Sequence, residues 1–75
     1  MREGDCVYFK QPFQPNPAIP KTYQQGIIAA IVTSESTDRV TDVIVRLYDP
    51  NRDAIHVDED GSSALYSFQR DELDW

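Results

Sequence analysis

The sequence predicts an all-β fold, a single small barrel of five strands. Three observations lead to this prediction: apolar and polar side chains alternate with a period of two along most of the chain, no apolar stripe of helical period runs beyond two turns, and 75 residues leave room for one domain. We therefore expect one domain over residues 1–75, with a long proline-rich first loop over 11–22 and a 3₁₀ turn near the C-terminus.

The first strand is expected over residues 5–10, where Val7 and Phe9 alternate with Cys6 and other outward or rim positions. We assign Val7 and Phe9 to the interior. The segment that follows, 11–22, holds four of the five prolines. Each proline lacks a backbone N–H and favours extended backbone in the residue before it, which predicts a stiff loop. Two apolar side chains are expected to fold this loop back onto the barrel: Phe13 and Ile19.

The second strand is expected over residues 23–33, and the spacing of Ile28 and Ile31 breaks its alternation by one residue. A β-bulge near Ala29 and Ala30 would return both isoleucines to the core and bend the strand, as a small barrel requires. Within this strand, the glycine at position 26 is expected where a neighbouring backbone passes closely.

The third strand follows a polar loop over residues 34–39, and its two faces differ clearly. The inward face is aliphatic and the outward face is mixed: Val43, Val45 and Leu47 against Ile44, Arg46 and Tyr48. The Asp-Pro pair that opens residues 49–53 favours a type I turn. The remaining elements are expected in this order: a short strand over 54–58, a turn over 59–61, a strand over 63–68 that pairs back on it, and a 3₁₀ turn over 69–73 that brings Leu73 and Trp75 to the barrel wall.

The net charge of −6 is unevenly distributed along the chain. Basic and acidic residues cancel up to position 48, and the whole acidic excess follows it. Nucleic-acid binders need Lys and Arg side chains that contact phosphates, and this chain has no stripe of them, so nucleic acid is not expected as a partner. Another protein with a basic or mixed surface suits the charge better.

The cysteine content and the apolar runs indicate where the protein resides. Cys6 is the only cysteine, so an internal disulfide is excluded and a reducing compartment is favoured. The longest apolar run, residues 27–32, is too short to span a bilayer, and nothing at the N-terminus resembles a signal peptide. We expect no membrane insertion and a cytoplasmic location, or the stromal side of a thylakoid-type membrane for a complex-bound subunit.

Residues capable of catalysis or metal binding are sparse. Cys6 and His56 are single, no nucleophile motif accompanies them, and the protein is not expected to be an enzyme. Alternation would align His56, Asp58 and Asp60 on one strand face, where they could hold a metal, but a partly exposed histidine without such a role is the preferred interpretation. No cofactor and no metal are predicted.

Three short motifs suggest a family resemblance: Gly4-Asp5-Cys6-Val7, Tyr23 followed by Gly26-Ile27-Ile28, and Phe68 followed by Asp71-Glu72-Leu73. With these motifs the chain resembles the SH3-like barrels that serve as accessory subunits in oxygenic photosynthesis. These are photosystem I reaction-centre subunit IV, the variable chain of ferredoxin-thioredoxin reductase, and the small O and S subunits of the photosynthetic NAD(P)H dehydrogenase complex. The resemblance implies an SH3-like barrel and a non-catalytic accessory or assembly role in a photosynthetic or related electron-transfer complex.

Other resemblances point elsewhere. Subunit IV offers a basic face to acidic ferredoxin, and this chain has no such face, so docking or scaffolding is expected rather than the ferredoxin role. The segment 64–68, Ala-Leu-Tyr-Ser-Phe, is similar to the signature of peptide-binding SH3 domains, but it lies near the end of the chain and no paired tryptophan accompanies it. A regulatory or nucleic-acid-associated barrel of the KOW type remains the alternative, since its strands also resemble Gly26-Ile27-Ile28.

Aromatic and arginine side chains supply the predicted partner-binding surface. Tyr, Trp and Arg carry much of the energy of protein interfaces, and Tyr8, Tyr48 and Tyr66 are expected at outward or rim positions. The predicted partner-binding patch combines the proline-rich loop with the second and third strands and consists of Phe13, Ile19, Tyr23, Arg46 and Tyr48.

Overall fold

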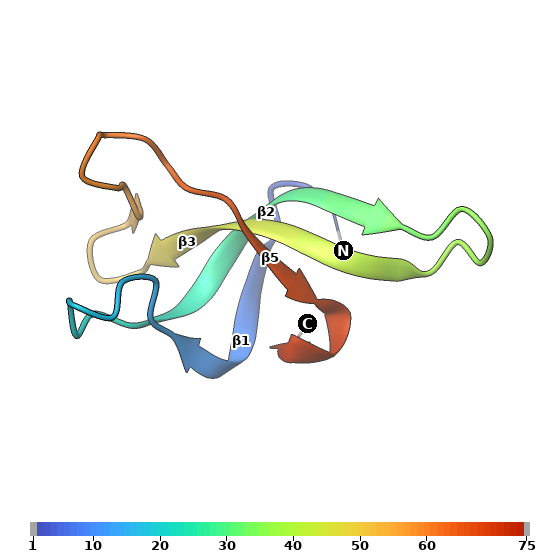
Figure 1. Cartoon of the computed structure of the whole chain (residues 1–75), viewed down its shortest axis with the longest axis horizontal. Helices are drawn as coiled ribbons and strands as arrows, with labels where there is room; N and C mark the ends of the chain where they lie inside the picture. The colour runs from blue at the N-terminus through green and yellow to red at the C-terminus, as the bar shows by residue number, and fades with distance from the viewer. Residues whose placement is uncertain (1, 75) are drawn as a thin grey trace.

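Residues 2–74 are described by a computed structural model, in which one antiparallel sheet of six strands forms a small barrel-like fold (Figure 1). The elements are β1 (Cys6–Phe13), β2 (Tyr23–Thr33), β3 (Val40–Asp49), β4 (Ala54–Ile55), β5 (Tyr66–Gln69), the 3₁₀ turn η1 (Arg70–Glu72) and β6 (Leu73–Asp74). Among these residues, no helix has the length and apolar character that crossing a membrane requires.

The order of the strands explains how the sheet curls. β1, β2 and β3 pair in sequence, β6 pairs with the other side of β1, and β5 and β4 pair with successive parts of the far side of β3. η1 carries the chain from β5, at one edge of the sheet, to β6, at the opposite edge. The all-β, small barrel-like fold expected from the sequence is confirmed, with β6 raising the number of strands from five to six.

The core lies between the curled walls of the sheet, and the face of β3 expected to point inward does so. Val43, Val45 and Leu47 are each 0 % exposed. Gly26 lies directly beside this core, because a Cβ added there would come within 3.0 Å of the Phe9 Cζ atom and 3.1 Å of the Val45 Cβ atom. A larger residue is therefore excluded at position 26 by neighbouring side chains, whereas a neighbouring backbone was expected from the sequence to pass closely there. The whole core comprises Val7, Phe9, Tyr23, Ile28, Val43, Val45, Leu47, Phe68 and Leu73.

The predicted β-bulge in β2 is confirmed. Ile28 pairs with Val45 and Ala30 pairs with Ile44, which leaves Ala29 as an extra residue in the β2–β3 ladder. The extra residue restores the inward direction of Ile31, which packs against the core on the far side of the bulge.

Two expectations for the first part of the chain are revised. β1 continues to Phe13 and so includes Pro12, which the sequence placed in the loop. The β1–β2 register shifts between Tyr8 and Phe13, and such an irregularity accommodates a proline because its missing N–H breaks no regular ladder bond. The proline-rich loop is therefore shorter than predicted.

The expected hairpin between residues 54–58 and 63–68 is wrong. β4 ends at Ile55, and β5 starts at Tyr66 and pairs with β3, so that Phe68 lies opposite Val43. This pairing brings the Phe68 ring onto Phe9, with ring centroids 4.6 Å apart, and burial of two aromatic rings outweighs a short exposed hairpin.

The predicted 3₁₀ turn is confirmed as η1. The Gln69 backbone N–H donates to Glu72 Oε1 at 2.9 Å, a reciprocal capping arrangement that closes the turn. Leu73 is delivered to the core, where it is 3 % exposed. The same prediction for Trp75 lies outside the described residues.

A two-stranded arm extends from the barrel at the β2–β3 connection (Figure 1). β1 pairs with β2 only as far as Ile27, and β5 pairs with β3 only from Asp42 onward, so the hairpin beyond these points is covered by neither strand. We call residues 29–41 the hairpin arm. It makes the molecule elongated, with extents of 39 × 24 × 22 Å.

Candidate protein-interaction surface

The outer face of the sheet carries a row of large side chains across neighbouring strands. The registers place Tyr8 beside Gln25, Gln25 beside Tyr48, and Tyr48 beside Ile55, from β1 to β4. Tyr8 is 53 % exposed, and Tyr48 is half-buried. Since alternate residues of a strand share a face, these side chains point away from the core.

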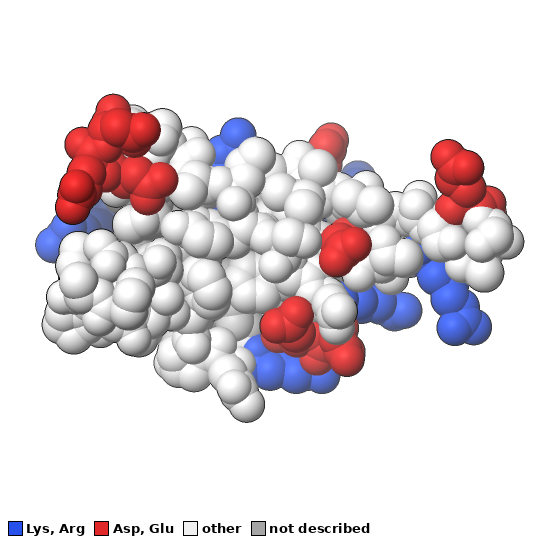
Figure 2. Space-filling view, viewed as in Figure 1, with Lys and Arg blue, Asp and Glu red and all other residues white. Residues whose placement is uncertain are grey.

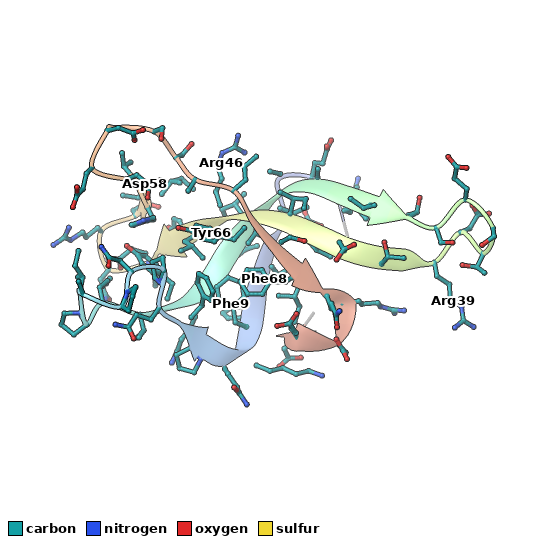
Figure 3. All side chains as sticks on the ribbon, viewed as in Figure 1. Phe9, Arg39, Arg46, Asp58, Tyr66 and Phe68 are labelled. Carbon is teal, nitrogen blue, oxygen red and sulfur yellow. The ribbon has the colours of Figure 1, made fainter. Side chains whose placement is uncertain are left out.

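A second row of three residues lies next to the first, and one of the three, Arg46, is charged. Here Cys6 lies beside Ile27, and Ile27 lies beside Arg46. Figure 3 shows Arg46 on the opposite side of the sheet from Phe9 and Phe68. Its Nε donates to the Ser63 hydroxyl at 3.4 Å, which holds the guanidinium over the sheet. We call the two rows together the outer-face patch: Cys6, Tyr8, Gln25, Ile27, Arg46, Tyr48 and Ile55.

Tyr48 is held in place by a turn at the end of β3. Its hydroxyl donates to Asp53 Oδ1. This hydrogen bond, with the negative charge of Asp53 beside it, raises the pKa of the Tyr48 phenol above its usual value. The hydrogen bond presents the Tyr48 ring in a fixed orientation.

Cys6 takes part in the patch as a neutral side chain. Its thiol lies 3.5 Å from Gln25 Oε1, in the position of a hydrogen-bond donor. Partial burial raises the pKa of the thiol, which disfavours the reactive thiolate. A role in packing and polar contact fits this environment.

An ion pair links the proline-rich loop to the end of β3, where the following turn begins. Lys21 Nζ lies 2.9 Å from Asp49 Oδ2, and the side chain of Asp49 is only 7 % exposed. The Asn51 backbone N–H also donates to Asp49, at 3.0 Å. The hydrogen bond from Lys21, followed by that from Asn51, lowers the pKa of the Asp49 carboxyl despite the opposing effect of burial.

A second set of contacts at this end joins Tyr23, His56 and Asp58. A hydrogen bond of 3.1 Å links the Tyr23 hydroxyl with His56 Nδ1, and His56 Nε2 lies 3.2 Å from Asp58 Oδ1. Asp60, the third member of the possible metal set, instead accepts two hydrogen bonds from Ser62, which lower the pKa of its carboxyl. Over residues 2–74, no group of three or more His, Cys, Asp or Glu side chains is arranged to hold a metal ion.

Aromatic rings line a shallow hollow on the opposite side from the outer-face patch. Phe13 packs edge-on against Tyr66 and Phe68, with ring centroids 5.1 and 5.2 Å apart. Residues of β1 and η1 complete a hollow of about 370 Å³. Tyr66 is half-buried beside this hollow, which fits the rim position expected for it, and burial raises the pKa of its phenol.

The structure separates the five residues predicted as one partner-binding patch. Arg46 and Tyr48 lie together in the outer-face patch, whereas Phe13 lines the aromatic hollow and Ile19, 48 % exposed, lies in the proline-rich loop. Tyr23 is 8 % exposed and belongs to the core, so it offers no surface to a partner. Its position was misjudged because the sequence does not reveal that a later segment, carrying His56, covers it.

Sequence reasoning also missed residues that the register brings into the patch. Tyr8 was expected at the surface together with Tyr48 but was not included in the predicted five-residue patch, and Gln25 and Ile27 were not considered. Only the pairing of β1 with β2 and of β2 with β3 makes them neighbours. The period of two assigned each residue to a face, but it does not give the alignment of one strand with the next.

The fold and the outer-face patch together define a small all-β barrel with an open sheet face. No family model matches the chain, and neither the curated proteins nor the solved structures compared with it include a match.

Proposed function

We propose that the protein is a non-catalytic module that binds another protein through its outer-face patch. The observation that carries the proposal is the row Tyr8, Gln25 and Tyr48, next to Arg46, on the outer face of the sheet. Tyrosine and arginine combine apolar area with hydrogen-bonding groups, which is why they dominate the energetic centres of interfaces. The side chains on the opposite face fill the core, so the patch residues are the ones that this part of the sheet offers for recognition.

The charge distribution supports a partner with a basic or mixed surface. Asp74 pairs with Tyr8 at one end of the row, and Asp53 holds Tyr48 near the other end, so carboxylates border the patch around the single guanidinium of Arg46. The net charge of −6 adds attraction at longer range. On the face that Figure 2 shows, Lys and Arg are scattered among Asp and Glu, which gives no support to the nucleic-acid alternative.

The resemblance to photosynthetic SH3-like subunits suggests the setting in which such a module works. We propose an accessory or assembly subunit of a photosynthetic or related electron-transfer complex, in the cytoplasm or on the stromal side of a thylakoid-type membrane. The chain would contribute binding and placement, and the partners would contribute the redox chemistry.

The test is a comparison of two double variants in affinity capture from the native cell extract. Arg46→Ala with Tyr48→Ala removes the centre of the patch, and we expect loss of the co-purifying partner with a folded domain by circular dichroism. Val57→Ala with Leu65→Ala is the matched control, because both side chains are more than half exposed and lie outside the patch. Retention of the partner by the first variant would show that the patch is not the binding surface.

A further inference from the structure

The hairpin arm has an unoccupied strand edge on β2. Ile28 is the last β2 residue tied to the N-terminal segment: its N–H donates to the Asp5 carbonyl at 2.9 Å, and its carbonyl accepts from the Gly4 N–H at 2.8 Å. From Ala29 to Thr33 none of the described strands pairs with this side of β2. Backbone groups on such an edge are available to another extended strand.

The residues of this edge include none of the charges or prolines that prevent strands from joining. Residues 27–33 contain no charged residue and no proline. Ile31, Val32 and Thr33 are β-branched, which suits extended backbone, and Val32 is 43 % exposed. Edge strands that remain unpaired are ordinarily protected by lysine, proline or an inward charge. From this edge we infer a pairing surface for a second copy of the same chain.

A second copy fits because the edge is complementary to itself. Antiparallel pairing about Ile31 places Ala29 opposite Thr33 and Ala30 opposite Val32, so no charges of the same sign meet. The paired segment is limited to the five residues Ala29–Thr33 of each copy, since Gly4 and Asp5 already occupy the edge at Ile28 and β2 ends at Thr33. The result is an isologous contact, closed by a two-fold axis.

The largest acidic cluster of each molecule stays away from this contact, although the arm region itself carries Glu35, Asp38 and Asp42 beside Arg39. The acidic excess lies after position 48, and its largest cluster, Asp58, Glu59 and Asp60, projects at the end opposite to the arm (Figures 1 and 2). Pairing through the arms keeps these clusters at the outer ends of the dimer. The contact is small, which predicts a reversible dimer of modest affinity rather than an obligate one.

The experiment compares two lysine substitutions by sedimentation equilibrium of the purified full chain. We expect the wild-type mass to rise with concentration from 8.6 kDa toward twice this value. Val32→Lys should remain at 8.6 kDa at all concentrations. The substitution places an ammonium group on the edge of each copy, and the two positive charges would repel each other in the pair. Val57→Lys is the control, since this valine is also exposed, at 52 % against 43 % for Val32, but lies outside the arm, and it should still associate.

Three outcomes overturn the inference. A wild type that stays at 8.6 kDa up to its solubility limit excludes self-pairing, and an edge that binds only a strand of another protein would give this result. Equal loss of association in both lysine variants would mean that an added positive charge at any exposed site prevents association, and not that the arm is the contact. Amide hydrogen exchange at Ile31 that does not slow with increasing concentration would place the contact elsewhere.

The inference is separable from the proposed function. Arg46→Ala with Tyr48→Ala should leave the wild-type mass distribution unchanged, because neither residue lies in the hairpin arm. Val32→Lys should conversely keep the partner captured through the outer-face patch.

Discussion

Individual residues in this small domain acquire their roles from neighbours that are distant in sequence. Asp49 illustrates this: the sequence identifies it as the first residue of an Asp-Pro turn, and the structure adds an ion pair with Lys21, 28 positions earlier. The turn is encoded locally and could be predicted. The ion pair depends on how the proline-rich loop folds back onto the barrel. The local sequence pattern does not predict that path.

Replacing Asp49 tests this role. Asp49→Asn can keep the hydrogen bond from the Asn51 N–H but loses the charge that pairs with Lys21, so we expect a lower melting temperature at pH 7. Because the folded-state pKa of Asp49 lies below its unfolded value, its stabilisation is present above about pH 4 and is lost as pH falls through the folded pKa. The difference between wild type and variant should therefore shrink in acid.

Thermal unfolding from pH 7 to pH 2 measures that difference. Glu59→Gln is the control, because it removes the same charge from an exposed site in the same half of the chain. A gap between wild type and Asp49→Asn that stays constant down to pH 2 would mean that lost packing, not lost charge, causes the effect.

At the scale of elements, the sequence predicts best those features that depend only on the spacing of residues within one element. The inward face of β3, the bulge at Ala29 and the 3₁₀ turn were all predicted from local spacing and are confirmed. The pairing of β5 with β3 and the burial of Tyr23 were not predicted, because both result from competition between distant segments for the same aromatic core. The candidate surface follows this rule: the face of Arg46 and Tyr48 was predicted, but its neighbours required the strand registers.

The linkage between β2 and the segment after β4 gives an element-scale prediction. Tyr23→Phe removes the hydroxyl that meets His56 Nδ1, and loss of one such hydrogen bond should lower the free energy of unfolding by about 1 kcal/mol. Urea denaturation of Tyr23→Phe, His56→Ala and the double variant measures the coupling. The two changes should be non-additive, and strict additivity would contradict an energetic link between the two segments.

On the scale of the whole molecule, shape and charge are arranged along one long axis. The arm occupies one end, and the acidic loop that includes Asp58 occupies the other (Figures 1 and 3). Composition predicted the size of the negative charge and its position in the sequence, whereas the separation of the two ends in space depends on the length of the β2–β3 hairpin.

Self-repulsion within the acidic half predicts a response to salt. The Debye length shrinks from about 10 Å at 0.1 M to about 3 Å at 1 M, so added salt should screen repulsion among exposed carboxylates and raise the melting temperature. Differential scanning calorimetry in sodium chloride at fixed protein concentration checks this. A falling melting temperature would show instead that screened ion pairs, such as Lys21 with Asp49, outweigh the repulsion.

The extra residue at Ala29 also separates two parts of the molecule that can vary independently. Before Ala29, β2 pairs with both β1 and β3. After Ala29, it pairs only with β3. Matched insertions or deletions of two residues on each strand would lengthen or shorten the arm without reversing which side chains face outward. Natural variation in length among proteins of this design should therefore accumulate between positions 30 and 41, which makes that stretch a suitable place for introducing new sequence.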